Sequence, residues 1–581
     1  MPEDEQKDEH IENVLAIKKQ FFEEIIPWII EHHPNKMDLS KKKRELSKKY
    51  KLQNVTDIEI YLNTPKESVN LVRTCLQTKP MRTGSGVAVI ATMTMPFNCP
   101  HGSCTYCPGG LNSAFGDVPK SYTGKEPSTM RGIRNNYDPY RIIFNRLEQY
   151  IILGQNPDKV DQIIMGGTFP SYPKEYRDEY IYYSYKAYND FSKLFFQNGI
   201  LDVDRFREFF ELPGNIYDTN RSERLKEKIL LLKNQDIKIL KEEQRINETA
   251  TIRCIGLTIE TKPDWAFADY GLEFLEYGAT RVELGVQTVY DDILTKVHRG
   301  HTIEDTKKAI ADLRDLGFKL NFHMMPGLPD VDGKRISREK DIASLKTIFS
   351  DPAYRPDMLK IYPCMVMPGT ALEREFRKGN FTPLTTEEAA DIIVEFKKYI
   401  PEYSRVMRVQ RDIPTYATTA GVGRTNLRQY IRDLARERNV HCRCIRCREI
   451  GAREILAEPQ IIIYEYDASS GKEFFISMEA GNNILGFVRL RFPPRSLHPS
   501  ITTDSAIIRE LHVYGQAVVI KGTDTTKTQH RGFGRKLVAK AEEIARSHEK
   551  NKMVVISGVG VKEYYWKLGY HNEGPYVAKE L

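Results

Sequence analysis

The sequence lacks long apolar segments. No run of about 18 apolar residues, the length that spans the hydrocarbon core of a bilayer, occurs among its 581 residues. The first ten residues, MPEDEQKDEH, are polar and acidic, whereas a secretory signal starts basic and continues apolar. These absences predict a cytoplasmic protein that binds no membrane and works in a reducing compartment, where cysteines are ligands more often than disulfide partners.

Cysteine is sparse, with nine residues in the whole chain, yet three of them stand close together. Cys99, Cys104 and Cys107 have the spacing C-x4-C-x2-C and follow an apolar run at residues 87–95. Thiolates at this spacing favour an iron–sulfur cluster, and three of them leave one iron of a 4Fe-4S cluster open to a substrate. Zinc is the alternative, because His101 in the same loop offers a fourth ligand.

Neither sign of charge dominates, since the net charge is only +7, but the basic residues are clustered. The first block is SKKKRELSKKYK at residues 40–51. The second spans residues 405–453 and contains Arg405, Arg408, Arg411, Arg424, Arg428, Arg432, Arg436, Arg438, Arg443, Arg446, Arg448 and Arg453. A solvated helix face is one interpretation of the first block, but the two blocks together favour a nucleic-acid partner.

Short apolar runs alternate with helical stretches over residues 81–380, after a basic, helical N-terminal extension at residues 1–80. Six such runs predict an α/β fold with a parallel, partial βα barrel. In such barrels the active face is formed by the residues that follow the strands. Candidates there for binding S-adenosylmethionine are Gly166, Gly167, Thr168, Glu260 and Gln287. Residues 172–250 contain no clear strand and are predicted to be a helical excursion.

A second group of thiols lies in the arginine-rich connector at residues 381–455. Cys442, Cys444 and Cys447 predict a structural zinc site that would stabilise a segment with little core of its own. The fourth ligand is open at this stage, with His441 and Cys364 as two candidates.

The last segment, residues 456–581, has its own α/β pattern. Four predicted antiparallel strands precede a loop with Gln529, Gly532 and Gly534, which leads into a helix. A Q-x-x-G-x-G loop at a helix N-terminus presents backbone N–H groups to a pyrophosphate. A further strand and an aromatic helix with Tyr564 and Tyr565 complete an order similar to that of GNAT acyl-CoA transferases.

These features occur together in one known family. The stretches CTYCPGG, MGGTFPSYPKEYR, RVELGVQT, QHRGFG and ISGVGVKEYYWKLGY carry a resemblance that extends from about residue 80 to the C-terminus. The sequence resembles the radical S-adenosylmethionine and GNAT family of tRNA wobble-uridine modifying enzymes, which includes the catalytic subunit of Elongator. The sequence resembles the form of this enzyme that occurs as a stand-alone protein.

The resemblance implies a fold, a reaction and a set of contacts. A radical SAM partial barrel would be fused to a GNAT domain. Cys99, Cys104 and Cys107 would hold a 4Fe-4S cluster, and a deoxyadenosyl radical from S-adenosylmethionine would activate acetyl-CoA. The product would be carboxymethyluridine in the anticodon stem-loop of tRNA, a tRNA uridine acetyltransferase activity. Acetyl-CoA contacts are implied at Lys159, Glu510, Leu511, His512, Val513, Phe533, Gly534, Arg535 and Tyr565, with Lys159 and Tyr565 closest to the chemistry.

Two other functions remain open from the sequence. The first is a protein lysine acetyltransferase with the barrel as scaffold, although an arginine-rich surface would repel a basic peptide. The second is a non-catalytic tRNA-binding module, although the cysteines, glycines and tyrosines of every motif are present. A homodimer is one oligomeric state to be tested.

Overall fold

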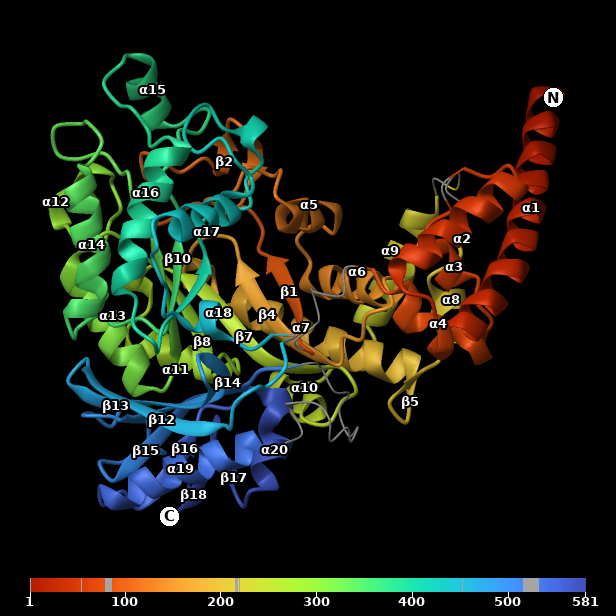
Figure 1. The fold of residues 1–581 in the computed structure, drawn as a ribbon. Coiled ribbons are helices and arrows are strands. Elements are labelled where there is room, and N and C mark those ends of the chain that lie inside the picture. Colours follow the sequence, from red (N-terminus) through yellow and green to blue (C-terminus); the bar gives the residue numbers. More distant parts are fainter. Residues whose placement is uncertain are drawn as a thin grey trace.

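A seven-stranded parallel sheet forms the centre of the molecule (Figure 1). The computed structural model describes residues 2–53, 55–78, 86–214, 218, 220–451, 453–515 and 532–581. The strand order is β1-β4-β7-β8-β9-β10-β11, and the ends of the sheet do not pair, so the barrel is partial. The strands are β1 (Ala88–Met93), β4 (Lys159–Met165), β7 (Arg253–Thr261), β8 (Arg281–Gln287), β9 (Lys319–Met324), β10 (Met358–Ile361) and β11 (Arg405–Arg408).

The six predicted strands are therefore present, and the connector supplies a seventh. β11 pairs in parallel with β10, although its sequence RVMR is too short and too basic to indicate a strand. Partner carbonyl and amide groups on β10, available only in the folded chain, decide its conformation.

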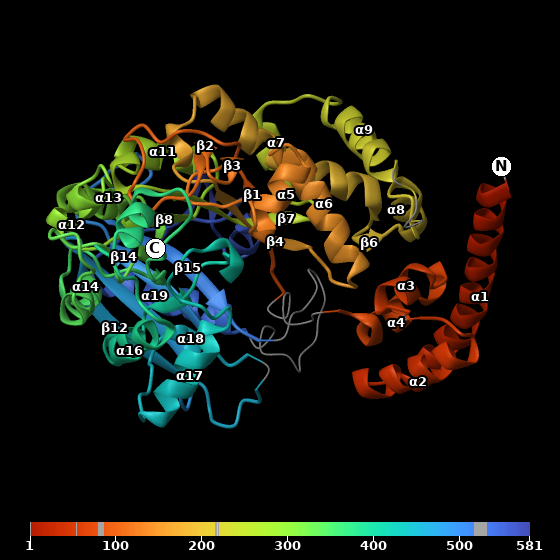
Figure 2. The ribbon, with the colours of Figure 1, turned by 90° about the horizontal axis from the view of Figure 1, so that it is seen from above.

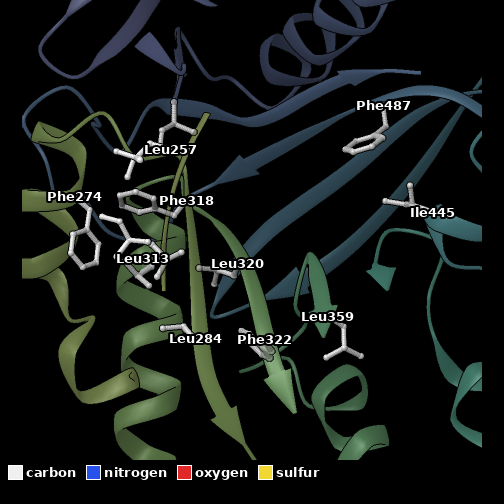
Figure 3. Packing of buried hydrophobic residues seen from close by; sticks show 14 of the residues in the cluster. Leu257, Phe274, Leu284, Leu313, Phe318, Leu320, Phe322, Leu359, Ile445 and Phe487 are labelled. Atoms are coloured by element: carbon white, nitrogen blue, oxygen red, sulfur yellow. The ribbon is translucent and has the colours of Figure 1, made fainter. Parts of the chain in front are cut away.

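Apolar side chains from the sheet and its covering helices form the largest core. Figure 3 shows Leu284, Leu320 and Phe322 of the strands beside Leu313 on a covering helix, and all four are fully buried. Each such side chain contributes about 1.5–3 kcal/mol on burial. The helices that follow the strands are α6 (Pro139–Ile152), α7 (Lys174–Phe195), α11 (Ala268–Glu276), α12 (Asp291–Lys296), α13 (Ile303–Asp315), α14 (Arg338–Ser350), α15 (Ala371–Arg377), α16 (Thr386–Phe396) and α17 (Leu427–Glu437).

The predicted helical excursion is largely helical. It contains α7, α8 (Val203–Phe209), α9 (Arg221–Lys233) and α10 (Leu240–Asn247). It also contains a hairpin that was not predicted, in which β5 (Phe196–Gln197) and β6 (Ile200–Leu201) have two residues each. Its tyrosines face the core, since Tyr180, Tyr185 and Tyr188 of α7 are buried. Among the described helices, none has the length and apolar character needed to cross a bilayer.

A second seven-stranded sheet is built from the C-terminal segment, in the order β12-β13-β14-β15-β16-β18-β17. β15 and β16 are parallel, and the other neighbours are antiparallel. The elements are β12 (Gln460–Ala468), β13 (Gly471–Ala480), β14 (Asn483–Phe492), β15 (Ser505–Val513), α19 (Phe533–Ser547), β16 (Lys552–Val555), α20 (Lys562–Trp566), β17 (His571–Glu573) and β18 (Tyr576–Glu580).

Buried ion pairs join this sheet to the amino ends of the parallel strands. Asp357, just before β10, accepts hydrogen bonds of 2.7 and 2.8 Å from Arg509 of β15. Arg491 of β14 reaches Asp315 at the end of α13, and all four of these side chains are fully buried. The second sheet therefore closes one end of the barrel, as the blue ribbon below the central strands shows in Figure 1.

The N-terminal helices have a small core of their own and lie to one side of the barrel (Figure 2). They are α1 (Pro2–His32), α2 (Lys36–Lys49), α3 (Asp57–Leu62) and α4 (Val69–Leu76). Hydrogen bonds from Arg207 of α8 to the carbonyls of Tyr61 and Thr64 connect them to the excursion.

Candidate active site

The three clustered cysteines line one cavity of about 450 Å³ at the carboxyl ends of the parallel strands. Gly167, Thr168, Glu260 and Gln287, predicted from sequence to follow the strands, line the same cavity. The fold thus brings Cys99 together with Gln287, which lies 188 positions later in the sequence.

Gly166 lies directly beside this cavity and has no room for a side chain. Its φ is +139°, and a Cβ at this position would lie 1.9 Å from Thr94 Oγ1. Gly167 has a φ of +111°, and its Cβ would lie 3.1 Å from the Cβ of Lys120. Both positions therefore require glycine, because the backbone has a positive φ there and the space for a Cβ is already occupied by Thr94 and Lys120.

Each candidate cluster ligand lies near a polar group, which for Cys99 is Thr168 Oγ1 at 3.9 Å. His101 Nε2 lies 3.4 Å from Cys104 Sγ, and Arg299 Nη1 lies 3.7 Å from the same sulfur. The backbone N–H of Ser121 donates to Cys107 Sγ over 3.3 Å. Such donors stabilise sulfur ligands that carry negative charge.

The spacing of the thiols fits a cluster better than one zinc ion. In the described chain, the ligand atoms that could surround one ion lie within 4.8 Å of one another at two places, and neither includes Cys99, Cys104, Cys107 or His101. A single zinc ion needs its ligands around one point, whereas a cluster spreads them over several irons. The donor set of three thiols therefore fits a 4Fe-4S cluster.

Glu260, at the end of β7, is held from two sides. Tyr122 donates its hydroxyl to Glu260 Oε2 over 3.1 Å, and the ammonium of Lys360 lies 3.6 Å from Oε1. Lys360 also contacts Glu283, which accepts a 2.8 Å hydrogen bond from His323. Glu260, Glu283 and His323 have the proximity of a metal site, but the cation between the two carboxylates is Lys360.

Neighbouring charges also determine the ionisation of the Glu283 carboxyl group. Burial alone would raise the pKa of Glu283, but Lys360 outweighs it, with help from the hydrogen bond of His323, and holds this pKa well below its usual range. Glu283 is therefore ionised, and it anchors the ammonium that faces Glu260.

Ion pairs continue toward the second sheet through the interior of the barrel. Arg281, the first residue of β8, lies 2.9 Å from Asp161 of β4, and both line the cavity. Glu510 of β15 lies 2.8 Å from Arg489, and its charge also acts on Arg281 and Lys319. Charged side chains thus occupy the interior from the amino ends of the strands to the cysteine loop.

The candidate acyl-CoA residues lie where β15 separates from β16. The two strands pair only over residues 505–508, while Glu510, Leu511, His512 and Val513 pair with β14 alone. Lys159 starts β4, at the end of the barrel that the second sheet covers. Among the described residues, positions 510–513 of β15 therefore have a strand partner on one side only.

The glycine-rich turn before α19 has features of a phosphate-binding loop. Gly532 has a φ of +73° and precedes Phe533, Gly534 and Arg535 at the start of α19. A Cβ at Gly534 would lie 2.7 Å from Tyr564 Oη, and this buried hydroxyl has no hydrogen-bond partner in the described part of the chain. Tyr565 is also buried. These groups fit a phosphate-bearing ligand; Gln529 lies outside the described residues.

The second thiol group is compact. The sulfurs of Cys442, Cys444 and Cys447 all lie within 4.8 Å of one another, and no fourth ligand joins them among the residues that the structure describes. His441 instead bonds to Asn439 over 3.0 Å, and Cys364 belongs to the same apolar cluster as Cys104. The donor set fits a thiophilic ion such as zinc.

Many arginines of the connector serve the fold and are not free for phosphates. Ion pairs of 2.7–2.8 Å link Arg405 to Glu449, Arg443 to Glu402 and Arg448 to Glu479. Arg432 and Arg436 of α17 have weaker contacts, at 3.4 and 3.9 Å from the half-exposed Asp433 of the same helix, and their side chains are 64% and 76% exposed. The phosphate-binding surface predicted from this run is therefore narrower than the sequence indicates.

Several residues of the cavity were missed by sequence reasoning, namely Tyr122, Arg281, Glu283, Arg299, His323, Lys360 and Arg411. A signal was present for some of them. β8 and β9 read RVELGVQ and KLNFHM, in which polar residues alternate with apolar ones although both strands belong to a buried parallel sheet. Alternation there indicates a polar interior.

Comparison with known proteins identifies the parts of the chain. Residues 93–338 match the radical SAM superfamily, residues 356–437 a radical SAM C-terminal domain, and residues 445–570 the GNAT acetyltransferase family. These matches confirm the predicted radical SAM barrel fused to a GNAT domain.

Relatives match over nearly the whole chain. A tRNA uridine(34) acetyltransferase of Methanocaldococcus infernus is 39% identical over 97% of this chain and 100% of its own length. Human Elongator complex protein 3 is 36% identical over 96% of both chains. The structure of the M. infernus Elp3 with an N-terminal deletion (1–46) matches 86% of this chain and 100% of its own, with 35% identity and a TM-score of 0.68. This chain belongs to the family of tRNA uridine(34) acetyltransferases and Elongator complex protein 3.

Proposed function

We propose that this protein attaches a carboxymethyl group to carbon 5 of the wobble uridine in tRNA, using acetyl-CoA and S-adenosylmethionine. One observation carries the proposal. A single cavity is lined by Cys99, Cys104 and Cys107 and also by Arg281 and Asp161, and the charge of Glu510 on β15 acts on Arg281. The radical and acyl chemistries implied by the two family matches are therefore adjacent in one molecule.

The cofactor residues have separate tasks in this proposal. A 4Fe-4S cluster with S-adenosylmethionine supplies radical chemistry when bound. Cys99, Cys104 and Cys107 would hold the cluster, and Glu260 would accept hydrogen bonds from the adenosyl group. Gly166, Gly167, Thr168 and Gln287 would shape the same pocket and exclude water from it.

The acyl-CoA residues complete the site. The turn Gly532, Phe533, Gly534 and Arg535 would bind the pyrophosphate together with Gln529, and β15 would bind the pantetheine through Glu510, Leu511, His512 and Val513. Lys159 would neutralise a phosphate, and Tyr564 and Tyr565 would orient the thioester. A zinc ion at Cys442, Cys444 and Cys447 would stabilise the connector, and metal analysis of C444S tests this assignment.

We assign tRNA contacts to two exposed basic surfaces. One is the groove beside α2, lined by Lys41, Arg44 and Lys48, and the other is the exposed face of α17. The extruded base would enter the cavity, because chemistry on a base requires it to leave the stack. We divide the chain into four segments, at residues 1–80, 81–380, 381–455 and 456–581. We assign the enzyme to the cytoplasm. Light scattering would determine whether it is a monomer or a homodimer.

The test is a complete reaction with anaerobically reconstituted protein, reductant, S-adenosylmethionine, labelled acetyl-CoA and tRNA. Label in carboxymethyluridine after RNA digestion is expected, and C104A should abolish it. C254A is the matched control, because Cys254 is buried on β7 and outside the lining of the cavity. Label on protein lysines without label in RNA would favour a lysine acetyltransferase. The charges of Arg281 and Lys319 near Glu510 disfavour such a basic substrate.

A further inference from the structure

Two consecutive residues in the loop after the cysteines contact both ends of the candidate radical site. The backbone N–H of Ser121 donates to Cys107 Sγ over 3.3 Å. The hydroxyl of Tyr122 donates to Glu260 Oε2 over 3.1 Å. We call residues 121 and 122 the 121–122 strap. Its position affects a candidate cluster ligand and a candidate cofactor carboxylate at once.

The strap has a backbone conformation that it would not adopt by itself. Ser121 has a φ of +73°, in the left-handed region. For a residue other than glycine this conformation is strained, so it persists only where neighbouring groups hold it. In this conformation the N–H of Ser121 donates to Cys107 Sγ while its carbonyl oxygen accepts from Arg411.

Arg411 holds the strap from the other side. Its Nη2 donates to the carbonyl oxygen of Ser121, and its guanidinium carbon lies 5.9 Å from the centre of the Tyr122 ring. Arg411 lines the cavity, unlike Arg432 and Arg436, whose side chains project into solvent. Its contacts are internal, so its role differs from that of a phosphate-binding arginine.

We propose that Arg411 is a positioning residue, which holds the left-handed conformation of Ser121 and thereby the N–H···S hydrogen bond to Cys107 and the contact of Tyr122 with Glu260. The inference rests on the proposed function, because it requires a cluster on Cys107. It separates Arg411 from the tRNA-binding arginines of the same basic run.

The expected consequence is electrochemical. A hydrogen bond to a cysteine sulfur stabilises the more negative, reduced form of an iron–sulfur cluster and so raises its reduction potential. If Arg411 is removed, Ser121 should relax to a negative φ and turn its N–H away from the sulfur. The cluster should then be harder to reduce.

The test is a redox titration of the reconstituted full-length protein followed by electron paramagnetic resonance. R411M should lower the ratio of reduced to oxidised cluster at least threefold at a fixed potential and weaken S-adenosylmethionine binding. Affinity for tRNA and its salt dependence should stay unchanged. R436M is the matched control, with weaker tRNA binding and an unchanged cluster signal.

A second variant tests the strap itself. Glycine adopts a positive φ without the steric cost of serine, so S121G combined with R411M should recover at least half of the lost reduced fraction. The proposal is overturned if R411M titrates like the wild type, if it weakens tRNA binding as R436M does, or if S121G gives no recovery. A failure of the proposed function would be distinct, because the wild type would then bind no cluster.

Discussion

The ammonium of Lys360 lies 3.6 Å from the carboxylate of Glu260 and also contacts Glu283, so that one lysine separates two buried acids. Lys360 thus contacts Oε1 of Glu260, while the hydroxyl of Tyr122 donates to Oε2. Glu260 comes from β7, Glu283 from β8 and Lys360 from β10, so three strands of the barrel build this one group.

We expect K360M to weaken S-adenosylmethionine binding by at least tenfold. Removing one partner of a buried ion pair leaves an uncompensated charge and costs about 3–5 kcal/mol, here with two carboxylates left side by side. Titration calorimetry of the reconstituted protein measures the affinity. K378M is the control, since Lys378 is exposed on the surface at the end of α15 and should bind as the wild type does. Equal affinities in both variants would contradict the role of Lys360.

Alanine at Gly166 should destabilise the protein and abolish binding of S-adenosylmethionine. Its Cβ would lie 1.9 Å from Thr94 Oγ1, and overpacking of this kind costs about 1–3 kcal/mol or more. G199A is matched for backbone conformation, because Gly199 has a φ of +79° with no heavy atom within 4 Å of an added Cβ. Thermal unfolding should show the larger loss for G166A, and a similar loss in both would remove the steric argument.

The interface between barrel and GNAT domain should depend on Asp357. Burial would raise its pKa, but Arg509 and then Arg489 outweigh burial and hold the pKa far below its usual range. D357N should lower the free energy of unfolding by about 3–5 kcal/mol, because it leaves buried arginines unpaired. Urea denaturation measures this loss, and exposed Asp332 provides the D332N control. Stability equal to that of the control would show that the pairs are dispensable.

Asp341 should make stability fall with rising pH. Burial raises its pKa to about 8, although the N–H of Gly327 donates to it over 2.8 Å. An unfolded aspartate has a pKa of about 3.9, so between about pH 4 and 8 the folded state binds the extra proton and loses stability as pH rises. D341N should remove this slope. Denaturation midpoints of both proteins at pH 5, 6.5 and 8 check it, and parallel profiles would contradict the assignment.

Local sequence was sufficient for most of the fold. Apolar runs followed by glycine or a polar residue located six strands of the barrel, and the α/β pattern of the last segment located the strands of the GNAT sheet up to β16. β11 and the final hairpin of β17 and β18 were missed. Both depend on neighbouring strands for their hydrogen bonds, and short segments such as these have little signal of their own.

The site divides along the same line. Thiol spacing and Gly-Gly pairs are local patterns with few alternative uses, so Cys99, Cys107 and Gly166 could be selected directly. Lys360 and Arg411 could not, because nothing near either residue in the sequence differs from an ordinary charged residue.

The arginine-rich run at residues 405–453 shows most clearly what the sequence alone cannot predict. Its composition predicts a basic surface, yet Arg405 and Arg448 are largely buried in ion pairs, whereas Arg436 is exposed and lies 3.9 Å from Asp433 of its own helix. The amino-acid order determined the cofactor motifs, the strands and the family of this protein. Only the tertiary structure decided which charges neutralise one another, because a charge is satisfied by whatever lies beside it in space, and those partners are up to several hundred residues away in the chain.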